Sequence, residues 1–233
     1  MGKHFTQAGV NGTIVVAVDV NGTAIHGGST ASALRPRYAP ASLQDSALFS
    51  LDAGAVADEF QVFKWDGVKR TFAGHNQDQT LRSAMRYSTL WVYEGFARQI
   101  GEPKARAYLR SIDYGNADPA TSKGAYWVDG NLRISALEQV AFLRKLSSQC
   151  PAVQGGAPAA GERPDGQAGD VGLDPARQDR LGRRYGWWVG WVESNEGAVF
   201  FALNIDTPRR TEDLPKREQI VRAVLESMNL LSE

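Results

Sequence analysis

Strand-forming sequence lies at both ends of this 233-residue chain, with mainly helical sequence between them. Residues 12–20 (GTIVVAVDV) are rich in β-branched residues and lead into Asn21-Gly22, a strong hairpin signal, after which residues 23–27 can return as a partner strand. Residues 187–192 and 199–204 are two further strand-forming runs, separated by a Ser-Asn-Glu-Gly loop that suits a hairpin. The pattern predicts an antiparallel sheet built from both ends of the chain.

Helical periodicity fills the rest of the sequence. Apolar residues recur at helical spacing near the end of the chain, where Lys216 to Leu231 carries Ile220, Val224 and Leu225 on one face. The other expected helices cover residues 47–56, with Gly54 near the end, and residues 81–100, 103–111 and 135–146. We expect one α+β domain over residues 1–233, an antiparallel sheet flanked by helices, with a helical subregion at about 43–150 and an atypical segment at 152–185.

Charge and residue counts exclude several functions. Lysine plus arginine (26) balance aspartate plus glutamate (26), so we expect neither nucleic-acid binding nor membrane insertion. The one cysteine, Cys150, excludes an intrachain disulfide, and His4, His26 and His75 lack metal-ligand spacing, so we expect no metal. Residues 1–3 precede a segment that alternates like a strand, without a charged and then apolar leader, so we expect no secretory signal in this sequence.

Seven short runs follow one another in an order that independent core packing has no reason to produce. Taken singly, each has an ordinary interpretation, the tryptophans as core aromatics and Tyr114-Gly115-Asn116 as a simple turn. The runs are YAPAS (38–42), DEFQVFKWDG (58–67), LRSAMRYS (81–88), YGN (114–116), YWVDGNLRIS (126–135), GWWVGWVE (186–193) and LPKR (214–217).

In this order the runs resemble class D (oxacillinase-type) serine β-lactamases over almost the whole chain. The resemblance implies a serine β-lactamase/transpeptidase-like fold, β-lactam antibiotics as substrates, a periplasmic location, and ring opening of penicillins through an acyl-enzyme. It also implies four parts: a nucleophilic serine at a helix start, a lysine three residues later that carbon dioxide carbamylates, a Ser-x-Val relay element, and a Lys-Thr-Gly strand that binds the substrate carboxylate. The sequence gives no sign of an oligomeric state.

The first of these motifs keeps its serine and lacks its lysine. Ser42 matches the nucleophile, and a helix start suits that role because backbone N–H groups and the helix dipole stabilise an oxyanion. Asp45 stands where the family has its carbamylated lysine. An aspartate carboxylate cannot become a carbamate, so we expect no cofactor of this kind and no general base for deacylation.

The other family positions carry over unevenly. Ser88 matches the relay serine, but Leu90 stands where valine or isoleucine is usual. Trp127 matches the tryptophan that steadies the carbamate. Arg217 matches the arginine that grips the substrate carboxylate, while a solvated charge at a helix start is an equally good interpretation of the sequence alone.

The Lys-Thr-Gly motif is missing before the run GWWVGWVE. The nearest counterpart is Arg180-Leu181-Gly182, in which leucine has no hydroxyl to offer the substrate carboxylate. Residues 154–179 just before it are rich in Gly, Pro, Ala and Asp and have almost no apolar periodicity. Such a composition is typical of a disordered surface insertion.

A slipped reading frame at both motifs is a second explanation, and the one we favour. Back-translation lets the codons for residues 172–185, shifted by one base, encode a phrase that contains Lys-Thr-Gly-Trp. Two bases restored after the Ser42 codon let the next codons encode Thr-Phe-Lys-Ile. A nucleotide sequence whose shifted frames encode neither motif would contradict this hypothesis.

Three functions follow from these observations. The first is a β-lactam hydrolase that is acylated on Ser42 and impaired in turnover. The second is a catalytically deficient penicillin-binding or β-lactam-sensing protein, in which a blocked acyl-enzyme persists. The third is a decayed or mis-sequenced β-lactamase with no function of its own.

Overall fold

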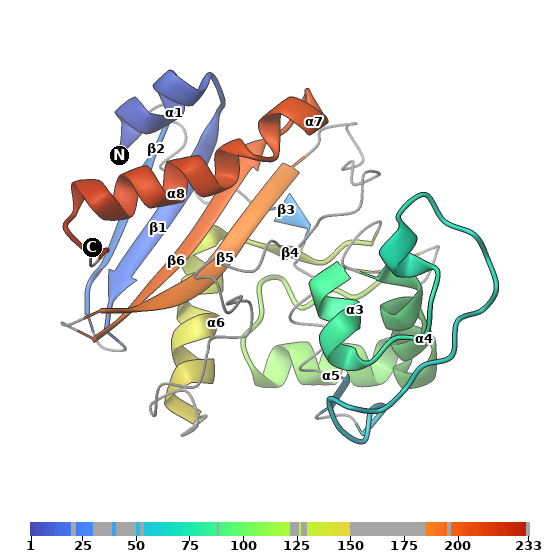
Figure 1. The fold of residues 1–233 in the computed structure, drawn as a ribbon. Coiled ribbons are helices and arrows are strands. Elements are labelled where there is room, and N and C mark those ends of the chain that lie inside the picture. Colours follow the sequence, from blue (N-terminus) through green and yellow to red (C-terminus); the bar gives the residue numbers. More distant parts are fainter. Residues whose placement is uncertain are drawn as a thin grey trace. The chain divides into compact units, whose positions relative to one another are not determined.

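The computed structural model describes residues 1–19, 22–29, 39–40, 50–51, 54–87, 89–121, 126, 130–149, 185–194 and 197–231. These residues fall into two compact units, each described by itself. The sheet unit has its described residues within Met1–Ala39, Ile134–Ala168 and Gln178–Glu233, and the helical unit within Pro40–Arg133 (Figure 1). The expectation of a single domain stays a prediction.

The sheet unit contains a four-stranded antiparallel sheet in the order β2-β1-β6-β5. Its strands are β1 (Gly12–Val18), β2 (Ala24–Gly28), β5 (Tyr185–Ser194) and β6 (Gly197–Asp206). In the centre, Val15 of β1 lies opposite Ala202 of β6, so strands from the two ends of the chain pair directly. This confirms the expected sheet and the α+β fold class.

The two hairpins differ in how closely they match expectation. The β5–β6 ladder runs to Ser194 opposite Gly197, as the loop sequence predicts, and the two residues between them lie outside the described residues. The β1–β2 ladder stops earlier, at Ala17 opposite Ala24. The first strand therefore ends at Val18 rather than at residue 20, and Asn21 lies outside the described residues.

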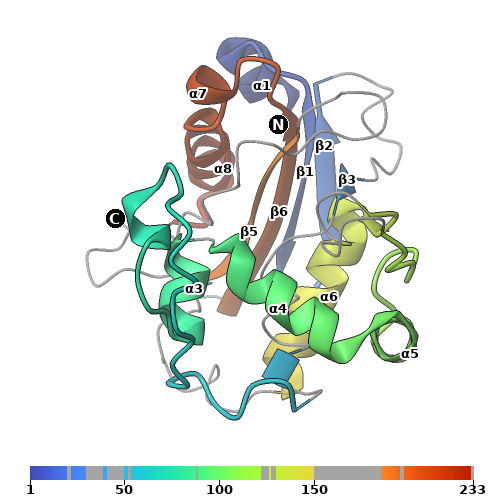
Figure 2. The ribbon, with the colours of Figure 1, turned by 90° about the vertical axis from the view of Figure 1, so that its right-hand side faces the viewer.

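Helices cover both faces of this sheet. Figures 1 and 2 show α1 (Gly2–Ala8) and α8 (Lys216–Ser227) on one face and α6 (Ala136–Gln149) on the other. Because the central strands β1 and β6 are buried along nearly their whole length, both are apolar on both faces. The core between the sheet and α8 includes fully or nearly fully buried Ile14, Phe201, Leu203, Ile220 and Val224.

Two terminal segments depart from the sequence expectation. The segment after residue 3 is not strand-like but continues α1, which ends at Gly9 in the left-handed conformation and buries Phe5. The last helix ends at Ser227, not at Leu231. There Asn229 takes a φ of 56°, and the Leu230 N–H donates to the Leu225 carbonyl at 3.0 Å, so the chain wraps back and buries Leu230.

The helical unit contains α3 (Leu81–Tyr87), α4 (Leu90–Ile100) and α5 (Glu102–Ser111), with a short 3₁₀ turn at Ala73–His75. The expectation of one helix over residues 81–100 was wrong, because the chain leaves helical geometry at Thr89. The Thr89 N–H donates to the Ala84 carbonyl and closes α3, and α4 begins at the next residue. The break therefore places Leu90 at the start of a separate helix, α4.

The helix expected over residues 47–56 ends before Gly54, so its last three expected residues are not helical. Ser50 and Leu51 are helical, and Gly54 has a φ of 67°, which an L side chain rarely adopts. The Ala55 N–H donates to the Ser50 carbonyl at 2.9 Å, and the Gly54 N–H donates to the Leu51 carbonyl at 3.1 Å, as in a Schellman cap. Residues 47–49 of the expected helix lie outside the described residues.

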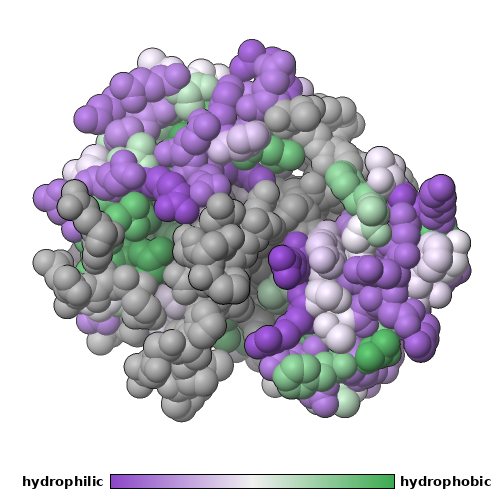
Figure 3. Space-filling view, viewed as in Figure 1, coloured by the Kyte–Doolittle hydropathy of each residue, from purple (hydrophilic) through white to green (hydrophobic). Residues whose placement is uncertain are grey.

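Two short strands form a second sheet. β3 (Ala39–Pro40) and β4 (Arg133–Ile134) pair with each other. Among the described residues, no helix has the length and apolar character needed to span a membrane. On the face drawn in Figure 3, the apolar surface of the helical unit lies in separate patches between hydrophilic residues.

Candidate active site

The structure describes only two of the site residues proposed from the sequence, Leu90 and Arg217. Leu90 belongs to the helical unit and Arg217 to the sheet unit, and each is treated within its own unit. The others lie outside the described residues, so their assignments stay predictions. They are Ser42, Asp45, Ser88, Trp127, Arg180, Leu181 and Gly182.

Leu90 is the first residue of α4 and lines a pocket of about 260 Å³ in the helical unit. A leucine at this position adds a methylene group compared with valine, so it takes space from the pocket. Trp91 beside it donates from its indole N–H to the His75 carbonyl at 3.1 Å, which holds the ring in place. The full lining is Arg70, Thr71, Phe72, His75, Leu90, Trp91 and Glu94.

Arg70 supplies a fixed cation to this pocket. Its guanidinium grips the Asp66 carboxylate with bonds of 2.8 and 2.6 Å and lies 5.5 Å from the centre of the Trp91 ring. The hydrogen bond from Arg70 is the main reason that the pKa of Asp66 is lowered to about 2. The Arg70–Asp66 pair therefore stays ionised through the neutral and mildly acidic pH range. The pocket combines aromatic walls with an arginine that is fixed by this ion pair.

Arg217 lies near the start of α8 with its side chain against β5. It is only 5% exposed, its Nε–H donates to the Leu214 carbonyl at 2.8 Å, and its Nη1–H donates to the Trp187 carbonyl at 2.9 Å. The interpretation of Arg217 as a solvated helix-start charge is therefore wrong. A buried guanidinium whose plane is fixed by two carbonyls suits recognition of a planar anion.

Gly186 explains why this long side chain can lie along the strand. A Cβ at Gly186 would stand 2.9 Å from Arg217 Cδ and 2.9 Å from Thr207 Cγ2, which is closer than real Cβ contacts. Only glycine therefore leaves room for Arg217 here. The sequence shows a glycine in the run GWWVGWVE, but nothing in the pattern indicates which side chain crosses it.

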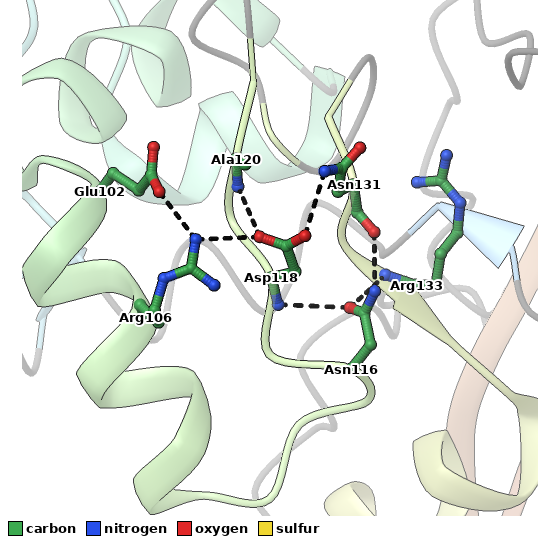
Figure 4. Close-up of polar contacts among 7 residues, drawn as sticks. All are labelled: Glu102, Arg106, Asn116, Asp118, Ala120, Asn131 and Arg133. Atoms are coloured by element: carbon green, nitrogen blue, oxygen red, sulfur yellow. Dashed lines mark hydrogen bonds and ion pairs between the residues drawn. The ribbon is translucent and has the colours of Figure 1, made fainter.

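The run YGN at 114–116 is the start of a polar network in the helical unit, shown in Figure 4. Asn116 accepts the Arg133 N–H at 2.9 Å and donates to the Asn131 carbonyl at 2.9 Å. Asp118 accepts from Arg106 at 3.0 Å, from Asn131 Nδ2 at 3.0 Å and from the Ala120 N–H at 3.2 Å. The turn interpretation was correct, since the Ala117 N–H donates to the Tyr114 carbonyl, but the turn also ties residues 116–120 to residues 131–133.

Sequence reasoning missed Asp118, although it clamps both ends of the segment that carries Trp127. One sequence signal was available, the i,i+4 spacing of Glu102 and Arg106, which favours an ion pair on a helix. In the structure this pair has an N–O distance of 2.7 Å, and Arg106 also forms an ion pair with Asp118. Burial would raise the pKa of Asp118, but bonds from the Ala120 N–H, Asn131 and Arg106 outweigh it, so its pKa is lowered. The carboxylate form is the one that the network holds.

Replacing Asp118 should destabilise the helical unit. We expect Asp118→Ala to lower the free energy of unfolding by about 1–2 kcal/mol at neutral pH, because three donors lose their acceptor. A carboxylate with a lowered pKa stabilises fully above its unfolded pKa, and that stabilisation is lost as the pH falls through the folded pKa. Urea unfolding of both proteins should therefore give a difference that shrinks below about pH 4. A difference that is constant down to pH 2 would contradict this assignment.

No cluster of three or more His, Cys, Asp or Glu side chains that could hold a metal occurs among the described residues. Within the described residues, the helical unit carries the Leu90 pocket and the Asp118 network, and the sheet unit carries the buried Arg217.

The comparisons first define a class. The family model described as the penicillin binding protein transpeptidase domain matches residues 12–154. The fold is also similar to that of the class D β-lactamase YbXI from Nostoc, with a TM-score of 0.77 and 27% identity, covering 99% of this chain and 98% of that one.

Curated relatives narrow the assignment. The chain is 52% identical to β-lactamase OXA-20 of Pseudomonas aeruginosa, covering 99% of this chain and 87% of the relative. It is 53% identical to β-lactamase OXA-2 of Salmonella typhimurium, covering 98% and 84%. The chain therefore belongs to the class D, OXA-type β-lactamases, which confirms the family inferred from the seven runs. The loss of two motifs within this family member stays a prediction.

Proposed function

We propose that this chain is acylated by β-lactams on Ser42 and releases the product poorly. The observation that supports both halves of the proposal is the sequence Ser42-Leu43-Gln44-Asp45, which lies in a chain 52% identical to a β-lactamase. It keeps the nucleophile of the family and replaces the general base. β-Lactams are accordingly the expected ligands, and the periplasm is the expected location by family.

The acylation step needs few groups. The Ser42 hydroxyl oxygen attacks the lactam carbonyl carbon, the ring C–N bond breaks, and the ring nitrogen takes the proton that the hydroxyl loses. A serine at a helix start has backbone N–H donors and the helix dipole to stabilise the oxyanion. By its match to the family's carboxylate-binding arginine, Arg217 would supply the counter-charge for the ligand carboxylate.

The second step needs a base that this sequence does not supply at residue 45. Water must lose a proton as it attacks the ester, and a positioned base typically contributes about 10²–10⁴-fold. In the family a lysine carbamate performs this role, and carbon dioxide is its source. Asp45 has no amine, so no carbamate forms there, and we expect no cofactor at this position.

Intact mass spectrometry tests the proposal. After incubation with benzylpenicillin, the protein should gain the mass of one penicillin, and the adduct should persist after the free drug is removed. A chromogenic cephalosporin should show little or no turnover. Ser42→Ala should abolish the adduct, while Ser46→Ala, four residues away, serves as the matched control and should keep it.

Each alternative gives a different result. Rapid turnover of the cephalosporin would contradict the impaired deacylation. A stable adduct without turnover is also what a β-lactam-binding or sensing protein requires, and the loss of the base is the observation that favours this second function. Absence of both adduct and turnover would overturn the proposal and leave a decayed β-lactamase.

A further inference from the structure

A buried carboxylate lies in the turn that leads into Arg217. Asp213 is the last residue of α7 (Arg210–Asp213), and it is fully buried. Its Oδ2 accepts the Arg209 N–H at 2.8 Å, and the Asp213 N–H donates back to the Arg209 carbonyl at 2.9 Å. The side chain and main chain of Asp213 therefore close the turn 209–213 from both sides.

Two cations hold the other oxygen of this carboxylate. Lys216 Nζ lies 2.8 Å from Asp213 Oδ1, and Arg209 Nη2 lies 3.4 Å from it. Burial would raise the pKa of Asp213, but the bonds from Lys216 and the Arg209 N–H keep its pKa below the usual value. Lys216 is itself the first residue of α8, so the ion pair fixes the start of that helix relative to the turn.

The turn is coupled to Arg217 through Leu214. The Leu214 carbonyl, one residue after Asp213, accepts both the Arg217 N–H at 3.3 Å and the Arg217 Nε–H at 2.8 Å. Lys216, the residue that directly precedes Arg217 in the chain, is the ion-pair partner of Asp213. Asp213 therefore binds the residue before Arg217 directly, and it closes the turn whose next residue, Leu214, supplies one of the carbonyls that orient the guanidinium.

We propose that Asp213 is a positioning residue that, through Arg217, sets how well this chain distinguishes a β-lactam with a free carboxylate from an uncharged one. The proposal rests on the proposed function, since it needs acylation of Ser42 and recognition of the carboxylate by Arg217. Bidentate recognition depends on the plane of the guanidinium, and that plane is fixed by the Leu214 and Trp187 carbonyls. Without the Asp213 carboxylate, the turn that leads into Leu214 loses the bonds that close it.

The experiment measures a ratio of acylation rates. The rate of adduct formation is followed by intact mass for benzylpenicillin and for its methyl ester, which lacks the negative charge. In the unmodified chain the acid should react faster than the ester. Asp213→Asn should reduce the acid rate about tenfold, the effect of weakening one charge-assisted hydrogen bond, and leave the ester rate unchanged. Arg217→Ala should remove the preference for the acid.

Further variants separate positioning from general damage. Asp213→Glu keeps the charge and should restore part of the preference. Lys216→Gln removes one partner of Asp213, is milder for folding, and should lower the preference about threefold, since a weaker neutral hydrogen bond remains. Glu218→Gln, which breaks the exposed Glu218–Arg222 pair on the same helix, is the matched control and should leave the ratio unchanged.

Several outcomes would overturn the inference. Equal losses for acid and ester in Asp213→Asn would show a structural role only. An unchanged ratio in Asp213→Asn, when Arg217→Ala loses the preference, would remove Asp213 from the mechanism and leave the proposed function intact. An unchanged ratio in Arg217→Ala would show that the carboxylate is recognised elsewhere. Absence of any adduct in the unmodified chain would overturn the proposed function together with this inference.

Discussion

The triple change Leu43→Thr, Gln44→Phe and Asp45→Lys should shorten the lifetime of the penicillin adduct on Ser42 by about 10²–10⁴-fold. A lysine three residues after the serine lies one helical turn away on the same face. We expect burial at this position to lower the pKa of the amine, so that its neutral form can react with carbon dioxide and gain the basic group that deacylation needs. The measurement is the decay of the adduct by intact mass, with bicarbonate present.

The controls for this restoration separate the base from the charge. Asp45→Asn removes the negative charge without adding an amine, so its adduct should last as long as that of the unmodified chain. The gain in the triple variant should also fall when bicarbonate is removed. An adduct that decays equally slowly in the triple variant, with bicarbonate in excess, would show that the missing lysine is not what limits this chain.

The sheet was predictable because its signal is local and strong. Residues 12–18 and 197–206 alternate or run apolar as buried strands do, and the closing hairpin has a loop sequence that suits it. α1 was missed because its seven residues span barely two turns and carry one core residue, Phe5, which gives no readable periodicity. The break between α3 and α4 was missed because the helical spacing of apolar residues continues across it. The break lies in the backbone dihedral angles of Thr89, which are not helical and which the apolar pattern does not indicate.

The site was less predictable than the fold, and the reason is distance along the chain. The resemblance placed Arg217, but its burial depends on Gly186, about 30 residues earlier, and on the Leu214 carbonyl. The role of Asp118 depends likewise on Asn131, a non-local partner. Pairs of this kind arise from tertiary packing, which no local pattern encodes.

Phe201→Ala should give the largest loss of stability, about 3–5 kcal/mol in the free energy of unfolding. Phe201 is 2% exposed at the centre of β6, and its ring packs edge-on against Trp188 with centroids 5.9 Å apart. Gly190 on β5 lies opposite it, and even a Cβ there would be only 3.4 Å from the Phe201 ring. The alanine side chain therefore leaves a cavity in a strand paired on both sides, where the backbone has little freedom to close in.

Phe60→Ala is the matched control, because Phe60 is 66% exposed and should cost less than about 0.5 kcal/mol. Urea unfolding of both variants and the unmodified chain gives the comparison. A small loss for Phe201→Ala would mean that the core built from β1 and β6 is not what stabilises the chain. A large loss would show that the paired strands from the two ends of the chain carry much of the stability of the sheet unit.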